Sequence, residues 1–205
     1  MEKFKSRAKF YIWLLCCCIL SVIISSPELR MKLTSCLVGC ALGEQFTNLK
    51  RVELDSVCND GSKAVVYFDD NIDFSKADGV IINLEGGGEC NYIDECHQRC
   101  DKGNRLCKVR QEPSLRMQHG IWSRENSNPF ANFFKIFHPY CSSDIHQGDN
   151  GPNDQTGGFP FNGKNILQNV LDTLKETYPL DKTPAFVMTG CSAGGKGRRF
   201  DLFNV

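Results

Sequence analysis

The pattern of apolar and polar residues predicts four short buried strands and one amphipathic helix beyond residue 48. The apolar runs contain the β-branched and aromatic residues typical of strands. They are Ala64–Phe68, Gly79–Leu84, Phe133–Phe137 and Ala185–Met188. Between Lys164 and Tyr178, apolar residues recur at helical spacing, and Pro179 ends the pattern. A helix that leads into a buried strand is half of an α/β unit, so we expect an α/β fold with a mixed sheet flanked by helices.

The N-terminal part of the chain has a different pattern. Four basic residues lie within the first nine positions, and the uncharged apolar run Phe10–Ser26 follows them. This arrangement is typical of a secretory signal peptide or an uncleaved signal anchor, and the length of the run leaves both alternatives open. We therefore expect a leader at residues 1–43, a single globular domain at 44–205, and a product that enters the secretory pathway, secreted or anchored by Phe10–Ser26.

Charge and cysteine content narrow the class of protein. The 24 basic and 24 acidic residues cancel, so no nucleic-acid partner is expected. Seven of the 12 cysteines lie beyond Gly43, and in an exported protein they predict disulfides. The cluster of Cys90, Cys96, Cys100 and Cys107 lacks the Cys-x-x-Cys spacing of zinc sites, so we expect no metal. Seven is an odd number, so at least one cysteine has no partner within this set.

The stretch after the last predicted strand carries the main chemical signal. Ala185–Met188 runs into Gly190-x-Ser192-x-Gly194, the form of a nucleophile elbow. A serine at the tip of a tight strand-to-helix turn has strained backbone angles, so the residues two positions away must lack bulk. A Gly/Ser-rich turn without catalytic function is the alternative interpretation.

Two further loops contain candidate site residues. The strand Gly79–Leu84 is followed by three glycines at 86–88, whose N–H groups can approach a ligand closely because there are no Cβ atoms. A structural turn is the alternative there. Ser143, Asp144 and His146 suggest a local triad, but neighbouring loop residues seldom converge, and a role in lining the substrate site is the better interpretation of Ser143 and Asp144.

Four ordered motifs resemble the pectin acetylesterase family, which includes the Notum-like carboxylesterases. They cover roughly residues 55–195. The first is Val57-Cys-Asn-Asp-Gly-Ser with Tyr67-Phe68-Asp69, and the second is Asn83-Leu-Glu-Gly-Gly-Gly-Glu-Cys90 with Cys96. The third is Pro139-Tyr-Cys-Ser-Ser-Asp144, and the fourth is Gly190-Cys-Ser-Ala-Gly-Gly195. The resemblance implies an α/β-hydrolase-like serine esterase that uses no cofactor and removes an acyl group, acetyl above all, from a polysaccharide or protein.

The resemblance also assigns roles to individual residues. It implies that Ser192 is the nucleophile and that Gly87, Gly88 and Ala193 are the oxyanion-hole donors. It further implies a disulfide between Cys90 and Cys96. Cys191 is serine in some members of the family, which makes it the candidate for the cysteine without a disulfide partner.

The sequence departs from the family pattern in two places. Glu89 occupies a position where the family usually has an aromatic residue. This difference affects the predicted wall of the substrate pocket, and with it the specificity for the acyl group or the alcohol. The acid and histidine of the family lie well downstream of the serine, whereas only Asp201 follows Ser192 here, with no histidine. We therefore expect a fold truncated after the elbow, with an uncovered sheet edge beside it. The alternative function is that of a secreted, inactive binding remnant of the family.

Overall fold

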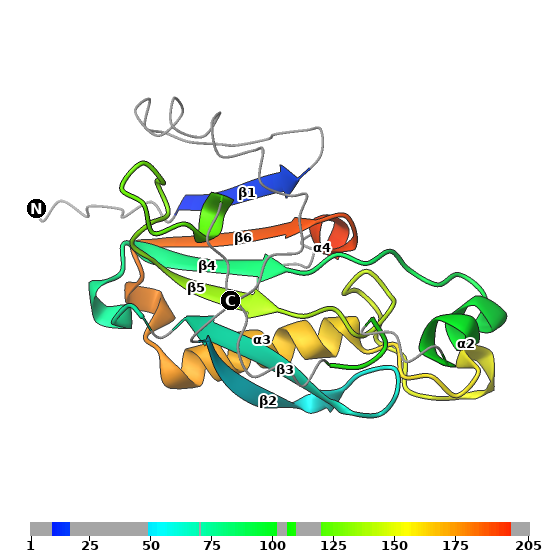
Figure 1. The fold of residues 1–205 in the computed structure, drawn as a ribbon. Coiled ribbons are helices and arrows are strands. Elements are labelled where there is room, and N and C mark those ends of the chain that lie inside the picture. Colours follow the sequence, from blue (N-terminus) through cyan, green and yellow to red (C-terminus); the bar gives the residue numbers. More distant parts are fainter. Residues whose placement is uncertain (1–9, 17–48, 70, 102–105, 110–119, 198–205) are drawn as a thin grey trace, which may run out of the picture.

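The computed structural model describes residues 10–16, 49–69, 71–101, 106–109 and 120–197 (Figure 1). Strands in this part of the chain form one sheet in the order β1-β6-β4-β5-β3-β2. Their bounds are β1 Phe10–Cys16, β2 Leu49–Val57, β3 Lys63–Asp69, β4 Gly79–Leu84, β5 Phe133–His138 and β6 Ala185–Cys191. The α-helices are α2 Ile93–Asp101, α3 Gly163–Thr177 and α4 Ala193–Gly197. Short 3-10 turns are η2 Phe74–Lys76, η3 Gly120–Trp122, η4 Asp154–Thr156 and η5 Leu180–Lys182.

The sheet is mixed. Strands β1, β6, β4 and β5 run parallel to one another, whereas β3 is antiparallel to β5 and β2 is antiparallel to β3. The β2–β3 hairpin turns at Asn59-Asp60-Gly61, where Gly61 has a φ of 79°. The expected α/β-hydrolase-like mixed sheet flanked by helices is confirmed, as are the four strands predicted from the apolar runs.

Both faces of the sheet are buried at β3, β4, β5 and β6, because alternate residues of these strands enter different clusters. Val66 of β3 and Ile82 of β4 belong to the larger cluster, which α3 covers. Tyr67 of β3 packs on the other face with Trp122. The apolar positions of α3 predicted by helical spacing are the ones that the structure buries, namely Ile166, Leu167, Val170, Leu171 and Leu174. Burial on both faces explains why the strands are continuous apolar runs.

The expected leader differs in part from the structure. Phe10–Cys16, the first seven residues of the apolar run, forms strand β1 and pairs in parallel with β6. The expectation of an uncovered edge beside β6 is therefore wrong, since an apolar run rich in aromatic residues can satisfy its backbone in a sheet. Residues 17–26 lie outside the described part. Among the residues that the structure describes, no helix is long and apolar enough to cross a membrane.

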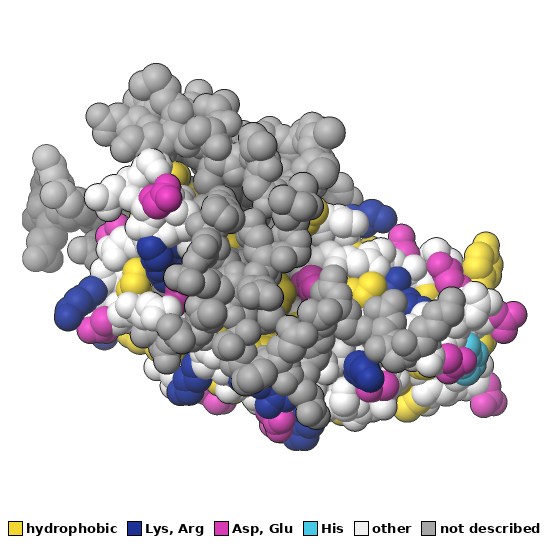
Figure 2. Space-filling model, in the orientation of Figure 1, with side chains coloured by type: hydrophobic (Ala, Val, Ile, Leu, Met, Phe, Trp, Pro, Cys, Tyr) yellow, Lys and Arg dark blue, Asp and Glu magenta, His cyan; other side chains and the backbone are white. Residues whose placement is uncertain are grey.

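Charged side chains of both signs lie interspersed over the described surface in the view of Figure 2. This distribution agrees with the balance of 24 basic and 24 acidic residues in the sequence. The two large apolar side chains exposed to solvent, Tyr92 and Ile93, lie together at the start of α2. The face shown in Figure 2 therefore has no extended patch of one charge among its described residues.

Candidate active site

Ser192 lies at the turn between β6 and α4. Its φ is 54°, in the left-handed region that residues with a Cβ rarely adopt, and the residue is exposed. Ala193, the first residue of α4, is buried. The N–H groups in the first turn of a helix have no partner within the helix. The turn thus presents a serine hydroxyl next to an unpaired backbone donor.

The two glycines that flank Ser192 are required by contacts with the neighbouring strand. A Cβ added at Gly190 would lie 2.5 Å from the carbonyl carbon of Gly194. One added at Gly194 would lie 2.1 Å from the carbonyl oxygen of Leu84, at the end of β4. Real Cβ atoms do not come so close to backbone. The Gly-x-Ser-x-Gly spacing is therefore needed because the turn packs directly on β4.

The glycine loop 86–88 lies against the same turn. Leu84 and Gly190 are partners in the parallel pairing of β4 with β6, so the carboxyl ends of the two strands are adjacent. A Cβ added at Gly86 would lie 2.2 Å from the carbonyl oxygen of Cys191 and 3.1 Å from the Cβ of Ser192. Gly88 has a φ of 70° and is exposed. The fold thus brings the glycine loop and the serine turn, about 100 residues apart in sequence, into contact.

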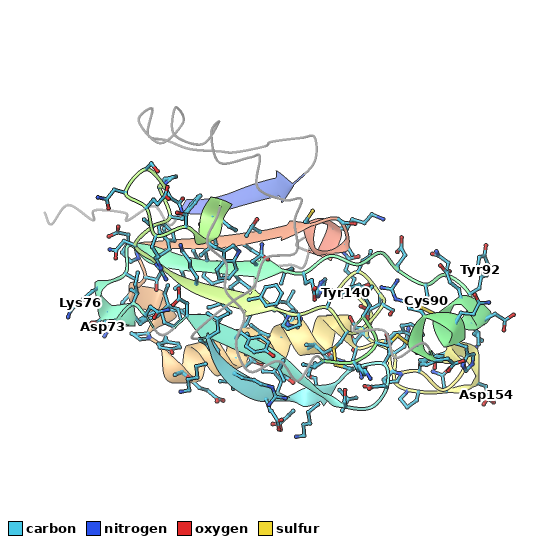
Figure 3. The ribbon with its side chains drawn as sticks, viewed as in Figure 1. Asp73, Lys76, Cys90, Tyr92, Tyr140 and Asp154 are labelled. Carbon is cyan, nitrogen blue, oxygen red and sulfur yellow. A yellow bond between two sulfur atoms is a disulfide. The ribbon has the colours of Figure 1, made fainter. Side chains whose placement is uncertain are left out.

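Glu85 connects the glycine loop to the segment that follows β5. Its backbone N–H donates to the carbonyl of His138 (3.0 Å), and its carboxylate accepts from the N–H of Tyr140 (2.9 Å). The Tyr140 hydroxyl accepts from the N–H of Ile145 (2.7 Å). Burial raises the pKa of the Tyr140 phenol. Figure 3 shows Tyr140 beyond the end of β5, between the sheet and Cys90.

Two buried histidines lie beneath this loop. The rings of His138 and His146 have centroids 5.2 Å apart, and His146 Nε2 is 2.9 Å from the carbonyl oxygen of Glu85. Burial lowers the pKa of His146 to about 3. Burial, and then the charge that His146 would carry, lower the pKa of His138 to about 3 as well. Nδ1 of each ring lacks a hydrogen-bond partner within the described part of the chain. Both histidines are therefore neutral at physiological pH.

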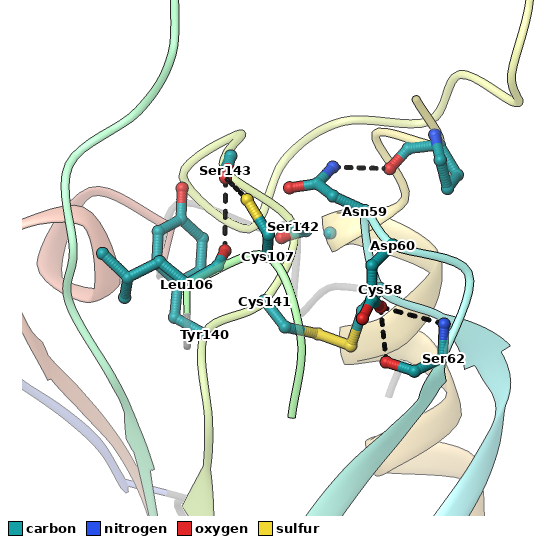
Figure 4. The surroundings of a disulfide bond; sticks show 12 residues. Cys58, Asn59, Asp60, Ser62, Leu106, Cys107, Tyr140, Cys141, Ser142 and Ser143 are labelled. Atoms are coloured by element: carbon teal, nitrogen blue, oxygen red, sulfur yellow. Dashed lines mark hydrogen bonds between the residues drawn. A yellow bond between two sulfur atoms is a disulfide. The ribbon is translucent and has the colours of Figure 1, made fainter. Parts of the chain in front are cut away.

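Ser143, Asp144 and His146 do not form a triad. The carboxylate of Asp144 accepts hydrogen bonds from the Ser142 hydroxyl (2.6 Å) and from the N–H groups of His146 (3.1 Å) and Gly163 (2.7 Å). Burial raises the pKa of Asp144. Ser143 is buried, and its hydroxyl donates to the carbonyl of Leu106 (Figure 4). These groups organise a loop that contains three residues with positive φ.

A family model for pectinacetylesterase matches residues 42–202. The chain belongs to the pectin acetylesterase family. It is 34% identical over 142 residues to the palmitoleoyl-protein carboxylesterase notum1 of Xenopus laevis, which is 68% of this chain and 28% of that protein. It is 33% identical over 142 residues to human NOTUM, and the match again covers 68% of this chain and 28% of that protein. Pectin acetylesterase 11 of Arabidopsis thaliana is 29% identical over 68% of this chain and 35% of that protein. The match thus spans 28% to 35% of these relatives' lengths.

Three disulfides join six cysteines in the described part of the chain. Cys90 is bonded to Cys96, as predicted, and the other disulfides in the described part are Cys58–Cys141 and Cys100–Cys107. These bonds occupy all four thiols of the cluster that a zinc site would have needed. Of the seven cysteines beyond residue 43, Cys191 alone keeps its thiol, also as predicted. This thiol lies directly before Ser192.

A charged pair, Glu89 with Lys196, lies beside the serine turn. Lys196 Nζ lies 3.2 Å from Glu89 Oε1, and the side chains are 64% and 35% exposed. The backbone N–H of Lys196 donates to the carbonyl of Ser192, so the two residues lie one helical turn apart. Glu89 directly follows the glycine loop. The pair therefore links the glycine loop to the helix that begins after Ser192.

No histidine or acid among the described residues contacts the Ser192 hydroxyl. Among the described residues, no side chain makes a hydrogen bond with the Ser192 hydroxyl. His138 and His146 are enclosed elsewhere, and His97 packs on Phe159 at a ring distance of 4.8 Å. Asp201, the candidate acid after Ser192, lies outside the described part. Sequence reasoning gave no role to Arg99, whose Nη2 donates to the carbonyl of Gly87 (2.5 Å).

Proposed function

We propose that this chain is the nucleophile-bearing part of a serine carboxylesterase of the pectin acetylesterase type. The observation that carries the proposal is the contact between the exposed, positive-φ Ser192 and the glycine loop at the adjacent ends of β6 and β4. The substrate is an acyl ester, acetyl above all, on a polysaccharide or a protein. The relatives named for pectin acetylesterase and for palmitoleoyl-protein carboxylesterase activity support this class of substrate.

The reaction begins with attack of the Ser192 Oγ on the ester carbonyl carbon. A new C–O bond forms, the carbonyl π electrons move to oxygen, and the serine proton passes to a general base. Gly87, Gly88 and Ala193 are the proposed donors to the oxyanion. Collapse of the intermediate expels the alcohol, which takes up the proton, and leaves an acyl-Ser192. Water then attacks the acyl-enzyme and releases the carboxylic acid.

The proposal requires an aspartate and a histidine from outside the described residues. A serine hydroxyl without a base is a weak nucleophile, so the oxyanion donors alone give only modest acceleration. The second candidate function follows from the same observation. Because no described side chain activates Ser192, a chain that keeps only this part binds an acylated substrate without turning it over.

Hydrolysis of p-nitrophenyl acetate distinguishes the two functions. The 205-residue chain and a longer product of the same locus are each compared with their Ser192→Ala variants. We expect the longer product to release nitrophenol with a burst that Ser192→Ala abolishes. Equal rates for the longer product and its Ser192→Ala variant would remove the esterase proposal. Binding of acetylated pectin fragments by the 205-residue chain, without hydrolysis, would favour the binding remnant.

Export through the secretory pathway is part of the proposal. Three disulfides among the described residues support it, because such bonds form in oxidising compartments. The leader at residues 1–43, a cleaved signal peptide or an uncleaved anchor, remains a proposal, and cleavage would remove β1 from the edge of the sheet. N-terminal sequencing of the protein secreted by an expressing cell tests it. A mature N-terminus near residue 44 would identify a cleaved signal peptide, an exported product that keeps Met1 would identify an anchor, and retention of the product in the cytosol would contradict export.

A further inference from the structure

Arg99 of α2 reaches the glycine loop through a charge-assisted hydrogen bond. Its Nη2 donates to the carbonyl oxygen of Gly87 at 2.5 Å, and the guanidinium carbon lies 5.9 Å from the centre of the Tyr140 ring. A Cβ built on Gly88 would be 3.8 Å from Nη1. Arg99 therefore contacts the Gly87–Gly88 peptide from the side of α2, with its guanidinium within cation–π distance of an aromatic face.

The contact fixes the direction of the Gly88 N–H. A trans peptide is planar, so its C=O and the following N–H point in opposite directions, and the described residues include no cis peptide. Holding the Gly87 carbonyl toward Arg99 turns the Gly88 N–H away from α2. Glycine has no intrinsic preference for either orientation of this peptide plane, because both signs of φ are open to it. The hydrogen bond from Arg99 thus favours one of the two orientations.

Arg99 is itself held by the disulfides on either side of it. Cys96 lies three residues before it and bonds to Cys90, two residues after Gly88. Cys100 is the next residue and bonds to Cys107. The first bond fixes α2 against the end of the glycine loop, and the second fixes the same helix against the segment beside Tyr140. The guanidinium consequently meets the Gly87 carbonyl without relying on the short α2 alone.

We infer that Arg99 is a positioning residue that aims the Gly88 N–H as a donor for a developing oxyanion. The inference rests on the proposed function, because it gives the glycine loop the role of an oxyanion hole. Among the described residues, the Gly88 N–H has no acceptor, and Gly88 is exposed. A donor that is aimed but unpaired is what a transient negative charge needs.

The first test measures the peptide itself and needs no catalysis. The amide resonance of Gly88 is followed in protein labelled with ¹⁵N-glycine, for the wild type and for Arg99→Gln, Arg99→Lys and Arg51→Gln. We expect Arg99→Gln to shift and broaden this resonance, and Arg99→Lys to retain most of the wild-type position. Arg51 pairs with exposed Glu53 on β2, so Arg51→Gln is the matched loss of a cation. An unchanged Gly88 resonance in Arg99→Gln would overturn the inference.

The second test measures transition-state-like chemistry at Ser192. A fluorophosphonate places a P=O oxygen where the oxyanion forms, and the rate of Ser192 labelling is followed by mass spectrometry. Loss of one oxyanion donor lowers the rate of reaction by about 10²–10³-fold. Arg99→Gln keeps the Gly88 N–H but no longer orients it, so we expect the rate of Ser192 labelling to fall roughly 10-fold or more. Added guanidinium ion should restore part of the rate of Arg99→Ala. Equal rates for wild type and Arg99→Gln would contradict the inference.

The two tests separate this inference from the esterase proposal. If Ser192 fails to react in the wild type and in the longer product, the esterase proposal fails, and the Gly88 resonance still decides the role of Arg99. If Arg99→Gln does not fold, Arg99→Met replaces it, since methionine keeps an unbranched apolar stem without donors, and an unchanged Gly88 resonance in that variant would overturn the inference. A Gly88 resonance that moves equally in Arg51→Gln would assign the effect to net charge and overturn the inference.

Discussion

The carbonyl oxygen of Leu84 leaves no room for a side chain at Gly194: a Cβ there would lie 2.1 Å from it. This contact joins the end of β4 to the helix that begins after Ser192. It makes the spacing around Ser192 a packing requirement of the sheet, whatever chemistry the serine performs.

Gly194→Ala should destabilise the fold and disturb the Ser192 turn. The obstructing atom belongs to backbone in a buried strand, so relief requires β4 and α4 to separate, and overpacking of this kind costs typically about 1–3 kcal/mol. Denaturant unfolding measures the loss. Gly151→Ala is the control, because a Cβ at Gly151 meets nothing within 4 Å. Similar unfolding midpoints for the two variants would contradict the packing argument.

The disulfide Cys58–Cys141 should contribute more stability than Cys90–Cys96. It closes a loop with a sequence separation of 83, against 6 for the other bond (Figure 4). Loop entropy then gives about 4.5 kcal/mol for the first and about 2.4 kcal/mol for the second. The double Cys→Ser variants of each pair, compared by denaturant unfolding, check the order. A larger loss for the Cys90–Cys96 pair would show that local packing outweighs chain entropy here.

Stability should fall as the pH is lowered from 7 toward 5. His138 and His146 have pKa values of about 3 in the folded protein, below the roughly 6.5 of an unfolded histidine. The unfolded chain therefore binds more protons in this window, and each histidine should remove about 2 kcal/mol by pH 5. Asp144, whose pKa burial raises, opposes this trend at lower pH, so unfolding is measured above pH 5.

His146→Gln is the variant that isolates this effect. Glutamine keeps a side-chain donor for the Glu85 carbonyl but does not titrate. The slope of the unfolding free energy against pH should become shallower, because one of the two histidines no longer contributes to it. The same slope in wild type and His146→Gln would assign the acid sensitivity to other groups.

Glu89→Trp should shift the preference of the proposed esterase toward longer acyl chains. The pair Glu89–Lys196 is largely exposed, so breaking it costs at most about 1 kcal/mol of stability. An indole ring beside the glycine loop can cover about two more methylenes of an acyl chain, which is worth roughly tenfold in relative kcat/KM. The ratio of p-nitrophenyl octanoate to acetate hydrolysis by the longer product measures it. Glu53→Trp on β2 is the control, and an equal shift there would contradict a local effect.

Local sequence patterns predict the four strands, the amphipathic helix and the serine turn, because these features are determined by residues close together in the sequence. The burial of Ile166 and Leu174 follows from helical spacing, and the glycines around Ser192 follow from the strain of a tight turn. The run Phe10–Ser26 was less informative, since apolar composition does not say whether a bilayer or a sheet receives the segment. β1 shows that at least its first seven residues can pair with β6.

The contacts around the turn could not be predicted in this way. Arg99 meets Gly87, and Glu89 meets Lys196, through side chains whose partners depend on how separate elements pack. Neither arginine nor lysine on a polar helix has a spacing that distinguishes it from a solvated residue. The burial of His146 also depends on packing, because a short polar loop rarely encloses a histidine. The contacts of such residues can be recognised only once the packing of the separate elements is known.

The contacts of Glu85 limit which residues can replace it during evolution. One residue donates to the His138 carbonyl, accepts from the Tyr140 N–H through its carboxylate, and lies 2.9 Å from His146 through its own carbonyl. A change of the side chain at position 85 therefore leaves the Tyr140 N–H without its acceptor, whereas the two backbone contacts remain. Position 85 should therefore retain a side chain that accepts a hydrogen bond, while the exposed positions of strand β2 accumulate substitutions independently.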